Sequence, residues 1–264
     1  MAEHPEIDTT VPHSARFWNY LLGGKDNFEV DRELAERALV LMPEIGEGAR
    51  ADRGFLVRAV RYLTGEAGVR QFLDIGTGLP TANNTHEVAQ GIAPESRIVY
   101  VDNDPLIMAH ARALLTSTPE GVTDYVQADL REPNVILREA ARTLDFSQPI
   151  ALMLLGILNF VVDDADAHAM VDQLIEALPS GSYMAISHPT PEIDAEKIRA
   201  GVQMWNESGG AQMVIRSRAE LVRFFDGLEL LEPGVVSDSL WRPDPSDLGA
   251  PGAVFHFGGV GRKP

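Results

Sequence analysis

From about residue 69, short apolar runs alternate with amphipathic segments along the chain. Apolar runs bounded by turn residues predict strands, and apolar residues that recur every three or four positions predict helices. Strands are predicted over residues 71–75, 97–101, 124–127, 150–155, 182–187, 228–236 and 253–258. Helices are predicted over residues 84–92, 104–115, 133–144, 164–178 and 191–205, and after the capping box at 217–220. This alternation indicates a doubly wound α/β sheet, whose ligands bind where the parallel strands end.

The first 65 residues have a different pattern, because no strand is predicted in them. Residues 1–12 are polar and expected to be disordered. An aromatic segment follows at 14–22, then a turn at 23–27, and then helices at 31–42 and 49–63. We therefore predict a helical extension, residues 1–65, ahead of a Rossmann-like domain over residues 66–264. Such an extension can fold over the open edge of the sheet and exclude water.

Composition and charge narrow the classes of function. The 264 residues carry a formal net charge of −17, which argues against nucleic acid and anionic membranes as partners. Cysteine is absent, which excludes disulfides, thiolate metal sites and cysteine nucleophiles. The histidines are scattered without ligand spacing, so no metal site is predicted. No signal peptide or membrane span is recognisable, and a cytoplasmic protein is expected.

Acidic residues stand at the ends of the first three predicted strands. Gly76 and Gly78 permit a tight turn after the first strand, but the third glycine of a dinucleotide-binding loop is missing. Asp74 would repel a pyrophosphate and suit an ammonium group. Asp102 can accept hydrogen bonds from ribose hydroxyls, and Asp129 can accept one from an exocyclic amine such as that of adenine. Three acids with no basic partner between them predict a site for a cationic nucleoside without phosphate.

Asp104 has a different interpretation, because Pro105 follows it at the start of a predicted helix. An aspartate before such a proline is favoured as the N-cap of the helix. Two of the site acids also have a purely structural alternative, Asp102 as a loop acid and Asp129 as a turn or capping acid, and the glycine turn after the first strand can occur without any ligand.

These residues resemble class I S-adenosylmethionine-dependent methyltransferases, through the block 72–80 with Asp102 and Asp129. The segment from Ser14 to Phe28, with its Tyr-Leu-Leu-Gly-Gly-Lys-Asp-Asn motif, resembles an actinobacterial family of such methyltransferases that was formerly a domain of unknown function. The resemblance implies a seven-stranded, mostly parallel sheet whose last strand is antiparallel. It also implies that S-adenosylmethionine is the cofactor. The predicted cofactor-binding residues are Tyr20, Gly23, Gly24, Lys25, Asp74, Gly76, Thr77, Gly78, Asp102, Asn103, Ala128, Asp129, Leu130, Leu155 and Gly156.

Two positions depart from the pattern of relatives. Pro80 replaces a frequent third glycine, and Asn159 stands where some relatives have a histidine. A general base is needed only if the attacking atom is protonated. His188, directly after the fifth strand, is the candidate base, and His86 is a weaker one; a structural role is the alternative for both. Trp205 and Trp241 line either a substrate pocket or the core.

The predicted function is methyl transfer by in-line displacement from S-adenosylmethionine to a small molecule. The bacterial context of the family that the chain resembles implies a secondary metabolite. The absence of cysteine excludes covalent attack on a pyrimidine ring, and the segment after the fourth strand lacks the Asx-Pro-Pro-aromatic loop of enzymes that methylate base amines. Two alternatives stay open: a protein that binds S-adenosylmethionine without turnover, and a nucleotide-dependent oxidoreductase. The sequence does not indicate the oligomeric state.

Overall fold

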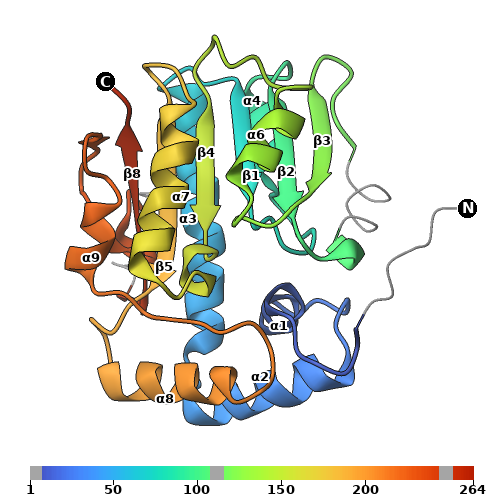
Figure 1. Ribbon diagram of the computed structural model, residues 1–264. Helices are drawn as coiled ribbons and strands as arrows, with labels where there is room; N and C mark the ends of the chain where they lie inside the picture. Colours follow the sequence, from blue (N-terminus) through green and yellow to red (C-terminus); the bar gives the residue numbers. More distant parts are fainter. Residues whose placement is uncertain (1–7, 108–115, 244–251) are drawn as a thin grey trace, which may run out of the picture.

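The computed structural model describes residues 8–107, 116–243 and 252–264. Within them, eight strands form one sheet in the order β3-β2-β1-β4-β5-β8-β6, with β7 also paired to β8 (Figure 1). The strands are β1 (Gln71–Ile75), β2 (Arg97–Asp102), β3 (Val122–Gln127), β4 (Ala151–Leu155), β5 (Tyr183–Pro189), β6 (Glu229–Leu230), β7 (Val236–Ser237) and β8 (His256–Arg262). The strands from β1 to β5 pair in parallel, and β8 is antiparallel to each of its neighbours. The predicted α/β fold with an antiparallel last strand is confirmed.

The end of the chain differs from the sequence prediction in two ways. The single strand predicted over 228–236 is interrupted by a turn that contains Gly234, whose φ is +83°, and this leaves the two-residue strands β6 and β7. The last strand runs over 256–262 rather than 253–258. The prediction ended it too early because glycines usually weaken strands. A Cβ on Gly258 would lie 2.8 Å from the Phe55 ring, and one on Gly261 would lie 2.7 Å from the Phe225 ring, so close packing favours glycine there.

Helices cover both faces of the sheet. On one face lie α6 (Pro133–Ala140), α7 (Asp164–Glu176) and α9 (Arg218–Arg223), and on the other lie α3 (Ile45–Gly65) and α4 (Thr85–Ile92). Each packs an apolar face onto strand residues that are buried on both sides, as expected for parallel strands. Ser217 caps α9 with Glu220 in the predicted capping box.

A third group of helices lies at the ends of the strands. Figure 1 shows α1 (Ser14–Leu21), α2 (Glu29–Leu41) and α8 (Ala195–Asn206) below the carboxyl ends of the parallel strands. They pack together through an apolar cluster that includes Phe17, Leu34 and Trp205. By contrast, α3 contributes Phe55 and Leu63 to the core of the sheet. The helices that stand outside the sheet layers are therefore α1, α2 and α8, and the domain boundary after residue 65 stays a prediction.

The helix predicted over 104–115 is described only at its start. Residues 105–107 are helical, and Asp104 Oδ1 accepts a hydrogen bond from the Leu106 N–H at 2.8 Å, which confirms Asp104 as the N-cap. Residues 108–115 lie outside the described residues, as do the first seven of the segment predicted to be disordered. No helix in the described ranges is long and apolar enough to cross a membrane.

Candidate cofactor and acceptor site

The glycine loop after β1 folds back onto β2. Gly76 has a φ of +80° and donates its N–H to the Val101 carbonyl at 2.8 Å, and Gly78 has a φ of +67°. A Cβ on Gly76 would lie only 2.7 Å from that of Ile157, so this position requires glycine for its conformation and its packing. The loop thus presents backbone rather than side chains to the space beside it.

Two adjoining cavities open at this end of the sheet. The first, of about 870 Å³, is lined by the predicted residues Asp74, Gly76, Thr77, Gly78, Asp102, Asn103, Leu155 and Gly156. The second, of about 550 Å³, shares Gly76, Asp102 and Asn103 and adds the predicted residues Ala128, Asp129 and Leu130. The residues predicted at four strand ends are therefore brought to one continuous surface, as the parallel topology requires.

The two innermost acids are buried and held by hydrogen bonds. Asp102 accepts the N–H of Gly78 and that of Asp104, each at 3.0 Å. Its burial raises its pKa, and these two N–H groups oppose the rise. Asp74 accepts the Thr85 hydroxyl at 2.6 Å. Burial raises the pKa of Asp74 to about 6, against the opposing effects of Thr85 and of Arg53.

The prediction that these acids have no basic partner is wrong. Arg53, on α3, lines the first cavity with Asp74 and donates to the Ala82 carbonyl at 3.1 Å. Arg131 bonds Asp129 at 3.1 Å, and Asn103 donates to the same carboxylate at 3.0 Å. Burial acts to raise the pKa of Asp129, but these contacts outweigh it and lower the pKa. Neither partner is evident from the order of residues along the chain. Arg53 precedes the sheet, and the side chain of Arg131 points back along the chain to Asp129.

The predicted residues of the N-terminal block do not line either cavity. Tyr20 is directed to α2, where its hydroxyl donates to Glu36 at 3.1 Å, and Lys25 is exposed. Gly23 and Gly24 shape the following turn; a Cβ on Gly24 would collide with the Asn19 amide. The block instead reaches the first cavity through other side chains, which are His13, Ser14, Ala15, Trp18, Asn19 and Leu22.

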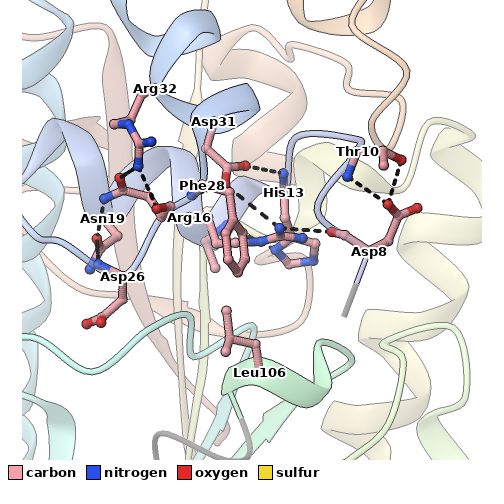
Figure 2. A network of polar contacts seen from close by, with 12 residues as sticks. Asp8, Thr10, His13, Arg16, Asn19, Asp26, Phe28, Asp31, Arg32 and Leu106 are labelled. Carbon is pink, nitrogen blue, oxygen red and sulfur yellow. Dashed lines mark hydrogen bonds and ion pairs between the residues drawn. The ribbon is translucent and has the colours of Figure 1, made fainter. Parts of the chain in front are cut away.

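A buried polar network holds α1 in place (Figure 2). Asp31 accepts the backbone N–H of His13 and that of Phe28, each at 2.9 Å. The guanidinium of Arg16 lies 3.8 Å from Asp31 and 3.7 Å from Asp104. Because Asp104 follows β2, these contacts join the N-terminal helices to the edge of the sheet where the cavities open.

His188 does not lie where a catalytic base could act. Its side chain is fully buried, with Nδ1 2.7 Å from the Pro189 carbonyl and Nε2 3.1 Å from Arg216. Burial lowers its pKa to about 3, and Arg216 adds to the effect. Both ring nitrogens are therefore engaged in structural contacts. His86 is also buried, and its Nδ1 lies 2.8 Å from the Tyr100 hydroxyl.

A third cavity, of about 760 Å³, lies between α1, α2, α8 and the sheet. We call it the apolar cavity. It shares Ser14, Trp18 and Gly156 with the first cavity, so the two spaces meet at these residues. Its lining is Ser14, Phe17, Trp18, Leu34, Ala38, Leu41, Met42, Ile45, Gly156, Asn159, Phe160, Pro189, Ile198, Gly201, Val202, Met204, Trp205, Met213, Phe255 and His256. Trp205 thus lines a pocket, whereas Trp241 is fully buried in the core.

An ionisable cluster that the sequence analysis missed lies where these spaces meet. His256 Nδ1 is 3.5 Å from an oxygen of Asp238 and 3.7 Å from one of Asp52. Burial acts to lower the pKa of His256, but the two carboxylates outweigh it and raise the pKa to about 9. Burial raises the pKa of Asp238 to about 7. One ligand atom from each residue lies within 4.8 Å of the others, a grouping that spacing along the chain cannot reveal.

Taken together, the doubly wound sheet, the glycine loop and the acids at the ends of β1, β2 and β3 define a class I nucleoside-binding fold of the methyltransferase type. The sequence matches the S-adenosyl methyltransferase family over residues 1–264, and the chain belongs to that family. Its cofactor is S-adenosylmethionine.

Solved structures agree with this assignment. A DUF574 family protein from Streptomyces avermitilis is 44% identical, with 98% of this chain and 100% of that chain covered and a TM-score of 0.93. A protein from Thermobifida fusca assigned as a methyltransferase is 40% identical, with 100% and 99% covered and a TM-score of 0.88. An S-adenosylmethionine-dependent methyltransferase from Anabaena variabilis, 13% identical with 98% of each chain covered and a TM-score of 0.56, shares the fold. No curated protein matches the chain.

The residues present fit the cofactor. Buried Asp102 offers acceptor oxygens for hydroxyls, and the charges of Asp74 and Arg53 are those that an ammonium and a carboxylate require. The apolar side chains of Leu130, Ile157 and Val161 line the second cavity, where a base can lie. The glycines of the loop leave room for close approach of the ligand to the backbone.

Proposed function

We propose that this protein transfers the methyl group of S-adenosylmethionine to a small, largely apolar acceptor that binds in the apolar cavity. The observation that carries the proposal is that Ser14, Trp18 and Gly156 line both this cavity and the first cavity, which we call the cofactor cavity. An acceptor in one space and a cofactor in the other would meet at Gly156. Its φ of +60° favours glycine, and the missing side chain keeps the passage open.

When bound, the cofactor would supply a methyl group on a positively charged sulfur, and the sulfur would leave as a nucleophile attacks the methyl carbon in line. The protein's part is to bind and align the two reactants, which can contribute roughly 7–11 kcal/mol to lowering the barrier. In this proposal Asp102 holds the ribose hydroxyls, Asp74 the ammonium group and Arg53 the carboxylate. The residues from Ala128 to Leu130 contact the adenine. Helix α1 covers the site and excludes water.

Binding measurements test the cofactor part of the proposal. Calorimetric titration with S-adenosylhomocysteine should show one site, whereas NAD should not bind, because Asp74 would repel its pyrophosphate. Binding of NAD in preference to S-adenosylhomocysteine would favour the oxidoreductase alternative.

A matched pair of variants on α8 tests the acceptor part. Gly201 lines the apolar cavity, and a Cβ there would meet no atom within 4 Å, so Gly201→Phe should fill the space. Gln203→Phe, on the exposed side of the same helix, is the control. With a panel of small aromatic and aliphatic acceptors, release of S-adenosylhomocysteine should fall at least tenfold in the first variant only. Tight cofactor binding with no turnover on any acceptor would favour a binding protein.

A further inference from the structure

We propose that His256 is the catalytic base of this site, that it takes the proton of a weakly acidic hydroxyl on the acceptor, and that Asp52 and Asp238 position its ring. The inference rests on the proposed function and names the chemistry of the acceptor: a phenol or an enol. No sequence motif points to these residues, because they come from α3, from the short 3-10 helix Asp238–Leu240 after β7 and from β8.

The position of the ring carries the argument. His256 lines the apolar cavity, and Asp52 lines the cofactor cavity. The Cε1 atom of His256 is 3.9 Å from where a Cβ on Gly156 would be, which places the ring at the passage between the two spaces. Trp18 packs edge-on against the ring, with 5.5 Å between centroids.

The orientation of the ring assigns a role to each nitrogen. Nδ1 is directed at the carboxylates of Asp52 and Asp238. Nε2 therefore lies on the other side of the ring, away from those carboxylates. In the neutral ring, the form that accepts the proton, a proton on Nδ1 that faces a carboxylate leaves the lone pair of Nε2 free, which is the arrangement of histidine bases in hydrolytic triads.

The surroundings favour the protonated ring after proton transfer. Besides the two carboxylates, the charged and titratable groups nearby are His188 from β5, with Arg216 behind it, and Arg53, which acts on Asp52. Asp238 is fully buried, and neither of its oxygens has a hydrogen-bond partner among the described residues. The imidazolium is thus the natural counter-charge of this acid. The raised pKa of His256, about 9, agrees with that geometry.

The chemistry limits the acceptor. A neutral amine can attack without losing a proton first, and a carboxylate is already ionised, so a strong base beside the passage is of use to a hydroxyl. The O–H bond breaks and the proton moves to Nε2. The oxygen forms its bond to the methyl carbon with a lone pair while the carbon–sulfur bond breaks and leaves its electrons on sulfur. The apolar lining suits an aromatic or enolic body that carries this hydroxyl.

An optical titration of a bound phenol tests the proposal. 4-Nitrophenol absorbs differently as phenol and as phenolate, so its apparent pKa can be measured when it is bound to the protein with S-adenosylhomocysteine. An apolar cavity alone would raise that pKa, because it disfavours the anion. If His256 takes or holds the proton, the apparent pKa should fall by one unit or more below the value in solution. A rise in the wild-type protein would overturn the proposal without any variant.

Variants sharpen the test. His256→Gln should reverse the sign of the shift, whereas His168→Gln, on α7, should leave it unchanged. The pKa of His256 can be measured by NMR titration of the histidine Cε1–H signals. Asp52→Asn and Asp238→Asn should each lower this pKa by one unit or more. An unchanged pKa in either variant would show that the substituted aspartate does not position the ring. Failure of 4-nitrophenol to bind, or binding that Gly201→Phe leaves intact, would refute the proposed acceptor cavity instead.

Discussion

The Asp102 carboxylate accepts the backbone N–H of Gly78, with 3.0 Å between Oδ2 and N. Asp102 is the last residue of β2 and Gly78 follows the neighbouring strand β1, so this bond holds the glycine loop against the acid proposed to bind the ribose. Hydrogen bonds to a charged group contribute about 1.5–3 kcal/mol.

We therefore predict that Asp102→Ala weakens binding of S-adenosylhomocysteine by about 10- to 100-fold, measured by calorimetry. The variant removes the ribose acceptor and also releases the loop. Asp124→Ala, on β3 and outside the cofactor cavity and the adjoining second cavity, is the control and should bind normally. Unchanged affinity in the Asp102 variant would show that the ribose is held elsewhere.

The carboxylate of the cofactor provides a second prediction. We expect Arg53 to bind this group, rather than Lys25, which was among the predicted cofactor-binding residues. Arg53 lines the cofactor cavity, whereas Lys25 is exposed and outside it. We expect Arg53→Ala to weaken S-adenosylhomocysteine binding about tenfold or more, and Lys25→Ala to change it less than twofold. Binding of 5′-methylthioadenosine, which has no amino-acid carboxylate, should be nearly unaffected by either. An equal loss for both ligands would mean that Arg53 acts on the fold rather than on the carboxylate.

Asp31 provides a third prediction, about the N-terminal helices. It is fully buried and accepts two backbone N–H groups beside the Arg16 guanidinium (Figure 2). Asp31→Ala leaves these donors buried without an acceptor, so the free energy of unfolding should fall by about 2–4 kcal/mol in chemical denaturation. Glu33→Ala, at an exposed position of the same helix, should change it little.

The same Asp31 variant tests the role of the helices as a cover. Because α1 supplies Trp18 and Asn19 to the cofactor cavity, S-adenosylhomocysteine should bind more weakly even under conditions where the variant is folded. Full affinity in a folded variant would show that this network stabilises the protein without contributing to cofactor binding.

Whether a site residue could be predicted from the sequence depends on the kind of contact that places it in the site. The acids at the ends of β1, β2 and β3 were correctly predicted to gather, because carboxyl ends of parallel strands must meet at one edge. Tyr20 was predicted to bind the cofactor, but the helical phase of α1 directs Ser14 and Trp18 to the cavity and Tyr20 to α2.

Contacts between distant segments were beyond that reasoning. Arg53 and Asp52 reach the site from a helix that precedes the sheet, and His256 comes from its last strand. Neither periodicity nor local motifs determine how such segments pack. His188 was chosen for its place directly after the predicted fifth strand, but it lies within β5 and is enclosed by Arg216 and the Pro189 carbonyl.

The last prediction concerns stability against pH. The pKa of His256 is about 9 in the folded protein, above its ordinary value of 6.5, so the folded state holds a proton that the unfolded state has lost. The stabilisation from this proton is complete below pH 6.5 and is lost as the pH rises to 9. The pKa values of buried Asp238 and Asp74 are raised from 3.8 to about 7 and about 6. These two groups therefore also make the protein less stable as the pH rises, but over a lower pH range than His256.

His256 can therefore be isolated between pH 7.5 and 9. Over that range the free energy of unfolding, measured by chemical denaturation, should fall by about 1–2 kcal/mol in the wild-type protein. His256→Gln should make the dependence nearly flat, and His168→Gln should keep the wild-type slope. If the wild-type and His256→Gln proteins lost stability in parallel, the proton responsible would reside on another group, and the carboxylates of Asp52 and Asp238 would not hold a charged imidazole between them.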